Sequence, residues 1–214
     1  MIQNISIIFL FTLLSCRNNN QIPTKPSTDT TIELIDNLGT LHLNIPYKSD
    51  TFLNWIRRND CGKSCEEGKY RFQNKNFPIF KESGFFWIGQ PEDSVYQLTI
   101  SHHRPDTLVR NNDSFAIKHY SYFKEGLEFD PETTNILSDT IQKINDRYYC
   151  ILKIADIDKK KGVLIRRLVA FTSISGNALR FRYDLLTRHR DSILYKFFDD
   201  SMKNLETVRI KDGF

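Results

Sequence analysis

Apolar and polar residues alternate most regularly in the C-terminal third of the chain. This period of two predicts three β-strands, over residues 148–157, 163–174 and 178–187. A tight turn at Gly176–Asn177 predicts a hairpin in which Ile174 lies opposite Leu179. We therefore expect an antiparallel meander with one apolar face.

After the meander the apolar spacing changes to three and four residues, which is typical of an amphipathic helix. The apolar positions are Ile193, Leu194, Phe197, Phe198, Met202, Leu205 and Val208. Asp191 or Ser192 is suited to be the N-cap. We expect this long C-terminal helix to cover the apolar face of the meander.

The N-terminal part contains a second hairpin and several shorter strand signals. Residues 32–35 and 40–45 predict two strands joined by a turn at 37–39. Further strands are predicted over residues 70–73, 85–88 and 95–102. The aromatic residues of segment 106–129 fit neither period, so this segment is expected to be either helical or irregular.

Two shorter helices are also predicted from apolar spacing. One follows Pro46 and carries an apolar face of Phe52, Leu53 and Ile56. The other begins near Pro131, and its stripe consists of Ile136, Leu137, Ile141 and Ile144.

These elements predict one α+β domain over residues 32–214: a mostly antiparallel sheet, made of the N-terminal hairpin and the C-terminal three-stranded meander, covered by the C-terminal helix. The meander and helix resemble the α/β/α sandwich of PsbP-like domains, a likeness of architecture that implies no functional residue. The chain has 214 residues, 40% of them hydrophobic and 26% charged. Collagen-like, polytopic and wholly disordered proteins are excluded by this composition. The net charge of +4 is too small for a dedicated nucleic-acid-binding domain, so no nucleic-acid partner is expected.

The first fifteen residues carry no charged side chain and include an apolar run over 5–14. This run is too short to span a bilayer, which takes about 20 residues, but it has the length of a signal-peptide core. It ends at Leu13-Leu14-Ser15-Cys16, and here the chain resembles the bacterial lipoproteins. The usual Lys or Arg near the initiator is absent. An ordinary secretory peptide and a buried N-terminal helix are the alternative interpretations.

The resemblance implies a signal peptide over 1–15, lipidation of Cys16 and a flexible tether over 16–31. Two or three acyl chains on Cys16 would anchor the protein stably in the membrane. No Asp follows Cys16 directly, and in lipoprotein sorting this implies the outer membrane, facing the periplasm. The expected location is therefore the cell envelope, and exposure on the cell surface is the alternative to the periplasmic side.

Three of the four cysteines remain when Cys16 is lipidated, and in an oxidising periplasm this predicts one pair and one single thiol. Cys61 and Cys65 are the disulfide candidate, which would fix a local loop. A redox-active pair would normally have two residues between the cysteines. Cys150 lies in a strand pattern and is expected to be a small core residue.

The sequence contains no complete metal-binding or catalytic motif. Cys61, Cys65, His102 and His103 are a conceivable zinc set, but exposed imidazoles at a strand end are the simpler interpretation. Gly62-Lys63-Ser64 lacks the earlier glycine of a phosphate-binding loop, because position 57 is Arg57. We therefore predict no catalytic residue, metal site or cofactor.

Arginines crowd the last two strands of the meander and their exit: Arg166, Arg167, Arg180, Arg182, Arg188 and Arg190. They form either a solvated sheet face or a patch, centred on Arg167, Arg180 and Arg182, for an acidic partner such as lipopolysaccharide phosphates or an acidic protein.

The leading functional hypothesis is a non-enzymatic, lipid-anchored domain that binds a protein or envelope component in the periplasm. Binding would use a sheet face or the loops between Gly89 and Glu132. The first alternative is an envelope enzyme acting on glycan or lipid through loop carboxylates such as Glu92, Asp93 and Asp106. The second is an immunity-type lipoprotein that neutralises a toxin.

Overall fold

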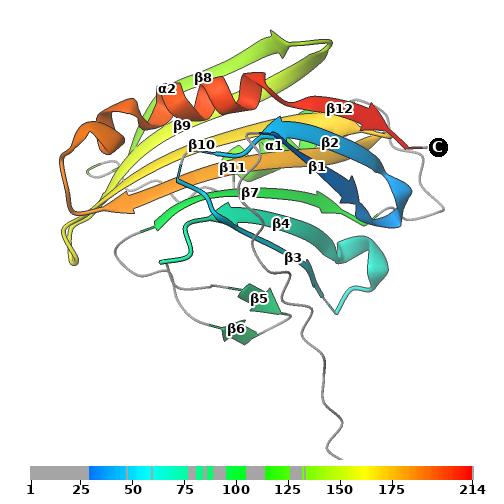
Figure 1. The fold of residues 1–214 in the computed structure, drawn as a ribbon, viewed down its shortest axis with the longest axis horizontal. Helices are drawn as coiled ribbons and strands as arrows, with labels where there is room; N and C mark the ends of the chain where they lie inside the picture. Colours follow the sequence, from blue (N-terminus) through cyan, green and yellow to red (C-terminus); the bar gives the residue numbers. More distant parts are fainter. Residues whose placement is uncertain are drawn as a thin grey trace, which may run out of the picture.

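A seven-stranded antiparallel sheet forms the frame of the protein (Figure 1). The computed structural model describes residues 29–46, 48–58, 60–76, 81–83, 86–88, 95–104, 114–125, 132 and 134–213. The strands of this large sheet, in spatial order, are β3 (Thr51–Arg57), β4 (Glu67–Gln73), β7 (Val95–His103), β11 (Asn177–Thr187), β10 (Val163–Ile174), β9 (Arg147–Asp158) and β8 (Asn135–Ile144). All neighbouring pairs are antiparallel.

A small sheet of three strands packs on one face of the large sheet. It consists of β1 (Asp29–Leu34), β2 (Gly39–Asn44) and β12 (Arg209–Asp212). The remaining elements are α1 (Ser114–Glu125), α2 (Ser192–Glu206), the ladder of β5 (Lys81–Ser83) with β6 (Phe86–Ile88), and the 3-10 turns η1 (Ile35–Asn37) and η2 (Lys63–Cys65). The protein is thus an α+β fold dominated by antiparallel strands. No helix of the described segments is long and apolar enough to cross a membrane.

The main core lies between the large sheet on one side and the small sheet with α2 on the other (Figure 1). Alternate residues of each strand point into it, because side chains of a strand alternate between the two faces. Among the fully buried members are Leu41, Leu98, Ile100, Ile151, Leu168, Phe181 and Phe197. We call this side of the large sheet the core face.

Helix α2 forms as predicted from its apolar stripe. The Asp191 carboxylate is the N-cap and accepts hydrogen bonds from the backbone N–H groups of Ile193 and Leu194, at 3.0 and 3.2 Å. Its buried residues are Leu194, Phe197, Ser201 and Leu205. The helix therefore covers the core face, as expected.

The opposite face of the large sheet has an apolar part and a charged part. Over β9 and β10, Cys150 and Phe171 belong to a second core cluster, on which Tyr120 and Phe123 of α1 pack. Over β4, β7 and β11 this face carries charged residues instead. The prediction of Cys150 as a core residue is confirmed, since it is buried and unpaired.

Both short helices predicted from apolar spacing are wrong. Residues around Phe52 form strand β3, in which Phe52 pairs with Phe72 of β4. Residues around Ile141 form strand β8, which pairs with β9 through a two-residue turn whose first residue, Asn145, has φ 54°. Both strands lie at edges of the large sheet, where Phe52 and Ile141 are exposed, so their apolar residues do not follow a strict alternation.

The meander is confirmed, but the register predicted for its second hairpin is wrong. The turn residues are Ser175 and Gly176, both with left-handed backbone at φ 45° and 73°, so Thr172 rather than Ile174 lies opposite Leu179. The pairing is displaced by two residues. Because side chains alternate with a period of two, every residue keeps its predicted face.

Most other strand predictions are confirmed with adjusted bounds. The N-terminal hairpin is β1–β2, joined through η1, and β1 begins at Asp29, three residues before the predicted domain start at Ile32. Strands β4, β6 and β7 correspond to the predicted strands at 70–73, 85–88 and 95–102. The ambiguous segment 106–129 contains helix α1.

Candidate anion-binding site

The charged part of the opposite face is assembled from four adjacent strands. Strand β10 contributes Arg167, which lies opposite Asp184 of β11. Strand β4 contributes Lys69 and Arg71, and their cross-strand partners on β7 are Ser101 and Thr99. These two residues in turn lie opposite Arg180 and Arg182 of β11. Since directly opposed residues share a face, the register alone brings all these side chains together.

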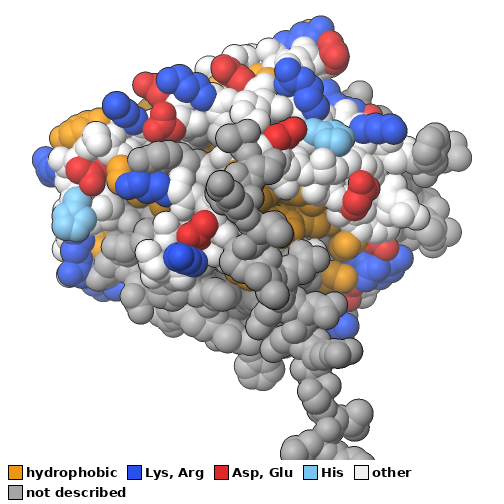
Figure 2. Space-filling view, viewed as in Figure 1, with side chains coloured by type: hydrophobic (Ala, Val, Ile, Leu, Met, Phe, Trp, Pro, Cys, Tyr) orange, Lys and Arg blue, Asp and Glu red, His pale blue; other side chains and the backbone are white. Residues whose placement is uncertain are grey.

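A cavity of about 110 Å³ opens on this part of the sheet. Its described lining residues are Lys69, Arg71, Val95, Gln97, Thr99, Arg167, Arg180, Arg182, Asp184 and Leu186. Among them are five cationic side chains and one carboxylate. We call the cavity with this lining the cationic cavity. On the face seen in Figure 2, Lys and Arg side chains are interspersed with Asp and Glu.

Asp184 holds two of the arginines in place. Its carboxylate accepts from Nε of Arg167 at 2.7 Å and lies 2.8 Å from Nε of Arg182. Burial alone would raise the pKa of Asp184, but the charges of Arg182 and Arg167 outweigh burial and hold this pKa well below its usual range. Asp184 is therefore ionised at neutral pH.

Both guanidinium groups contact Asp184 through their Nε edge. Neither has a hydrogen-bond partner at its Nη atoms among the described residues. Burial, together with the neighbouring charges of Arg167 and Arg180, lowers the pKa of Arg182. An additional negatively charged group beside Arg182 would therefore stabilise its charged form.

A second buried carboxylate, Glu67, lies at the edge of the cavity. Its oxygens are 3.3 Å from Nζ of Lys69, 3.4 Å from Nη2 of Arg180 and 3.5 Å from Nη1 of Arg57. Burial would raise the pKa of Glu67, but the surrounding cations, Arg180 and Lys69 foremost, lower it to about 2. The single negative charge of Glu67 is therefore shared by several neighbouring cations.

Arg71 is held between two side chains of neighbouring strands. Its Nε donates to Oγ1 of Thr99 at 2.9 Å, and its guanidinium carbon lies 4.9 Å from the centroid of the Trp55 ring. These contacts restrict the guanidinium, so its charge is presented in a fixed position.

The structure brings together the three arginines that the sequence predicts as a patch, Arg167, Arg180 and Arg182. Arg166 is directed to the core face instead, because it alternates with Arg167 along β10. Sequence reasoning missed Lys69 and Arg71. Their signal is the strict alternation Glu67, Lys69, Arg71, Gln73 with Gly68, Tyr70 and Phe72 along β4.

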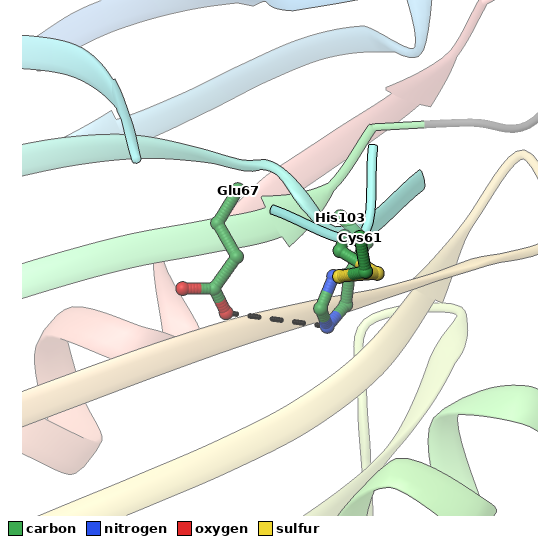
Figure 3. Close-up of a disulfide and its surroundings, with 4 residues drawn as sticks. Cys61, Glu67 and His103 are labelled. Carbon is green, nitrogen blue, oxygen red and sulfur yellow. Dashed lines mark ion pairs between the residues drawn. A yellow bond between two sulfur atoms is a disulfide. The ribbon is translucent and has the colours of Figure 1, made fainter. Parts of the chain in front are cut away.

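The predicted cysteine pair lies beside this site. The structure links Cys61 and Cys65 by a disulfide around η2. Figure 3 shows it next to His103, whose Nε2 lies 4.0 Å from an oxygen of Glu67. The disulfide therefore fixes the loop that leads into β4.

The interpretation of both histidines as exposed imidazoles is wrong. His102 is 2% exposed and lies on the core face, where its Nε2 is 3.3 Å from the hydroxyl of Tyr70. His103 lies on the opposite face and is partly buried. The reason is that β7 continues to His103, which pairs with Glu67 of β4, while His102 pairs on both sides, with β4 and β11. No group of three or more His, Cys, Asp or Glu side chains suited to a metal ion occurs among the described residues.

Several predicted features lie outside the described residues. These are Cys16 with its signal peptide, the tether up to residue 28, and the loop carboxylates Glu92, Asp93 and Asp106.

No protein-family model matches the chain, and none of the curated proteins compared with it matches either. Among solved structures, a crystal structure from Bacteroides thetaiotaomicron is similar with a TM-score of 0.36 and 10% sequence identity. The similarity covers 80% of this chain and 45% of that chain. A likeness this distant carries no argument about function, which has to come from the site itself.

Proposed function

We propose that this protein is a lipid-anchored domain of the bacterial cell envelope that binds an anionic component of the envelope in its cationic cavity. The observation that carries the proposal is the pair Arg167 and Arg182, which line the cavity, share the single carboxylate of Asp184 and have Nη atoms without a hydrogen-bond partner among the described residues. These partly buried guanidinium groups can donate to a bound anion, which would also compensate their charge. Binding, rather than catalysis, is the role that this lining favours.

The electrostatics of the two carboxylates support a non-enzymatic role. General acid–base catalysis uses groups with a pKa near the working pH. The pKa of Glu67 is lowered to about 2 and that of Asp184 is lowered further, so both stay ionised at neutral pH. They position arginine and lysine side chains instead of exchanging protons.

The anchor in this proposal rests on Leu13-Leu14-Ser15-Cys16. Twelve residues separate Cys16 from the first residue of β1, Asp29. The thirteen residue steps from Cys16 to Asp29 reach at most about 47 Å when fully extended. The domain would therefore stay close to the membrane to which Cys16 is attached, in our proposal the periplasmic side of the outer membrane.

The proposal is tested in cells that produce the tagged full-length protein. Cys16→Ala should move the protein from the membrane fraction to the soluble envelope fraction. For binding, the wild-type protein is crosslinked in intact cells, purified from detergent-solubilised membranes and compared with the Arg167→Gln/Arg182→Gln variant. Lys196→Gln, on the exposed side of α2, is the control for loss of a positive charge outside the cavity.

The bound component should disappear with the double variant and persist with Lys196→Gln. Equal recovery from all three proteins would contradict binding in the cationic cavity. One tightly bound protein in stoichiometric amount, insensitive to the arginines, would favour the immunity-type alternative. Hydrolysis of envelope glycan or lipid by the purified protein would favour the enzyme.

A further inference from the structure

We infer that the protein self-associates through strand β8, which pairs antiparallel with β8 of a second copy around a two-fold axis at Ile141. This inference goes beyond the proposed function and does not depend on the cationic cavity. Three observations carry it: the position of β8 at the edge of the large sheet, the exposed apolar side chain at the centre of its regular part, and the opposite charges on either side of that centre.

Strand β8 is the last strand of the large sheet, and none of the described strands pairs with its outer edge. In Figure 1 it lies at the margin of the sheet, beside β9. It has ten residues, whereas strands usually have about five or six. A long edge of this kind presents a row of backbone donors and acceptors on which a further strand can pair.

The hairpin turn shows which backbone groups of β8 face outwards. Ile144 and Arg147 close a two-residue turn, so they form a hydrogen-bonded pair. Hydrogen-bonded and non-hydrogen-bonded positions alternate along antiparallel strands. The backbone N–H and C=O groups of Asp139, Ile141 and Lys143 therefore point away from β9, towards the outer edge.

The regular part of this edge is symmetric about Ile141. It runs over residues 138–144, from the register shift after Ile136 to the turn. When this stretch pairs antiparallel with its copy, Ile141 lies opposite Ile141 and Asp139 lies opposite Lys143 at both ends. All three outward-facing positions then exchange backbone hydrogen bonds with outward-facing positions of the second copy.

The side chains at these positions favour this register over its neighbours. Ile141 is 67% exposed, and pairing at the axis would cover the two copies of this side chain with each other. Asp139 and Lys143 would form two cross-strand ion pairs. Axes at Asp139 or Lys143 would place like charges opposite each other, and axes at Thr140 or Gln142 would place a charged residue opposite Ile141.

The helices leave this arrangement room on the sheet. Both α1 and α2 pack chiefly on β10 and β11, which lie further inside the sheet than β8. From α1, the side chains of Tyr120 and Lys124 reach Asp139 and donate hydrogen bonds to its carboxylate. A carboxylate has about four acceptor positions, so Lys143 of a second copy can share it.

The inference is tested with two full-length forms that carry different affinity tags. They are co-produced in one cell and purified from detergent-solubilised membranes through one tag, and we expect both forms to be recovered. Lys143→Asp in both forms should reduce recovery of the second tag by about tenfold or more, because two ion pairs become two pairs of like charge. Lys196→Asp, the same exchange on the exposed side of α2, should leave recovery unchanged.

An exchange of charges tests the register itself. Asp139→Lys in both forms should also prevent association, whereas Asp139→Lys in one form and Lys143→Asp in the other restores opposite charges at both ends. Recovery of the second tag should therefore return in this combination. Circular dichroism shows whether each variant is folded. Recovery that is the same for all variants overturns the inference.

Cysteine pairs test the register without changing a charge. In the proposed pairing, exposed Thr140 of one copy lies opposite exposed Gln142 of the other in a non-hydrogen-bonded pair, with Cα atoms about 4.5 Å apart. Thr140→Cys in one form and Gln142→Cys in the other should therefore form a disulfide between copies on mild oxidation. Two copies of Thr140→Cys would be about 8 Å apart at Cα and should not.

Absence of the mixed disulfide, or equal crosslinking in both combinations, overturns pairing about Ile141. Recovery of a different protein crosslinked at position 140, in place of the second copy, also overturns it. The Arg167→Gln/Arg182→Gln variant should crosslink as the wild-type arginines do, since the cavity lies on other strands. Failure of this inference therefore leaves the proposed function standing, and failure of the proposed function leaves this inference standing.

Discussion

Arg182 and Asp184 lie two residues apart on β11, on the same face of the large sheet, with Nε of the arginine 2.8 Å from the carboxylate. Strand alternation places them side by side, and Arg167 of β10 reaches the same carboxylate. Asp184 is 3% exposed, so it is the buried centre of the three-residue ion cluster.

Asp184→Asn should destabilise the protein, because it removes the charge that compensates two arginines on a largely buried face. Breaking a buried ion pair costs about 3 to 5 kcal/mol, and we expect the lower end since Arg182 is partly exposed. Urea unfolding measures the change in the free energy of unfolding. Asp199→Asn, on an exposed position of α2, is the control and should change it by less than about 0.5 kcal/mol. An equal midpoint for both variants would show that the cluster contributes little stability.

The stability of the protein should fall in acid through protonation of Glu67. Its pKa is lowered from 4.5 to about 2 in the folded state, so its ionised form favours folding. This contribution is fully present above about pH 4.5 and is lost as the pH falls towards 2. Unfolding monitored between pH 6 and 2 should give a flatter profile for Glu67→Gln. Profiles of the same slope would contradict the role assigned to Glu67.

Thiol labelling should distinguish Cys61, Cys65 and Cys150. Without reductant, Cys61 and Cys65 should resist alkylation, and Cys150 should react only after unfolding because it is buried. The loop that the disulfide closes is short, so Cys61→Ser/Cys65→Ser should cost about 2 kcal/mol or less. Mass spectrometry after alkylation decides the pairing. Labelling of both cysteines in the native, unreduced protein would show that no disulfide forms.

Helix α2 offers a matched pair of aromatic residues for testing the core. Phe197→Ala should cost about 3 to 5 kcal/mol, since Phe197 is fully buried and contacts Tyr96 and Phe198. Tyr195→Ala should be nearly neutral, because Tyr195 is 71% exposed on the same helix. Thermal or urea unfolding measures both. Similar losses for the two variants would mean that α2 does not cover the core as described.

The parts of the fold that depend on local signals could be predicted from the sequence. Alternation and short turns locate β9, β10 and β11, and the N-cap with an apolar stripe locates α2. Edge strands β3 and β8 were predicted as helices because their apolar residues, exposed on one or both faces, match helical spacing by coincidence. The predicted register of the β10–β11 hairpin was two residues off. Both Ser175–Gly176 and Gly176–Asn177 suit a tight turn, and the sequence does not distinguish them.

The sequence predicts the part of the site that lies on neighbouring strands of the meander, but not the part on β4. Arg167, Arg180 and Arg182 lie on strands that are adjacent in sequence, so a hairpin brings them together. Lys69 and Arg71 belong to β4, which is separated from β11 by more than a hundred residues and reaches it through β7. Pairing between such distant strands is set by tertiary packing, which the local pattern does not encode.

The most direct test of the account is photo-crosslinking from inside the cationic cavity. A photoreactive amino acid at position 186, where Leu186 lines the cavity, is activated in intact cells and the adduct is identified by mass spectrometry. The account predicts an anionic envelope component that is captured there, is lost when Arg167 and Arg182 are replaced by Gln, and is not captured from position 196 on α2. Capture of the same component from both positions, or without dependence on the two arginines, would contradict binding in the cavity.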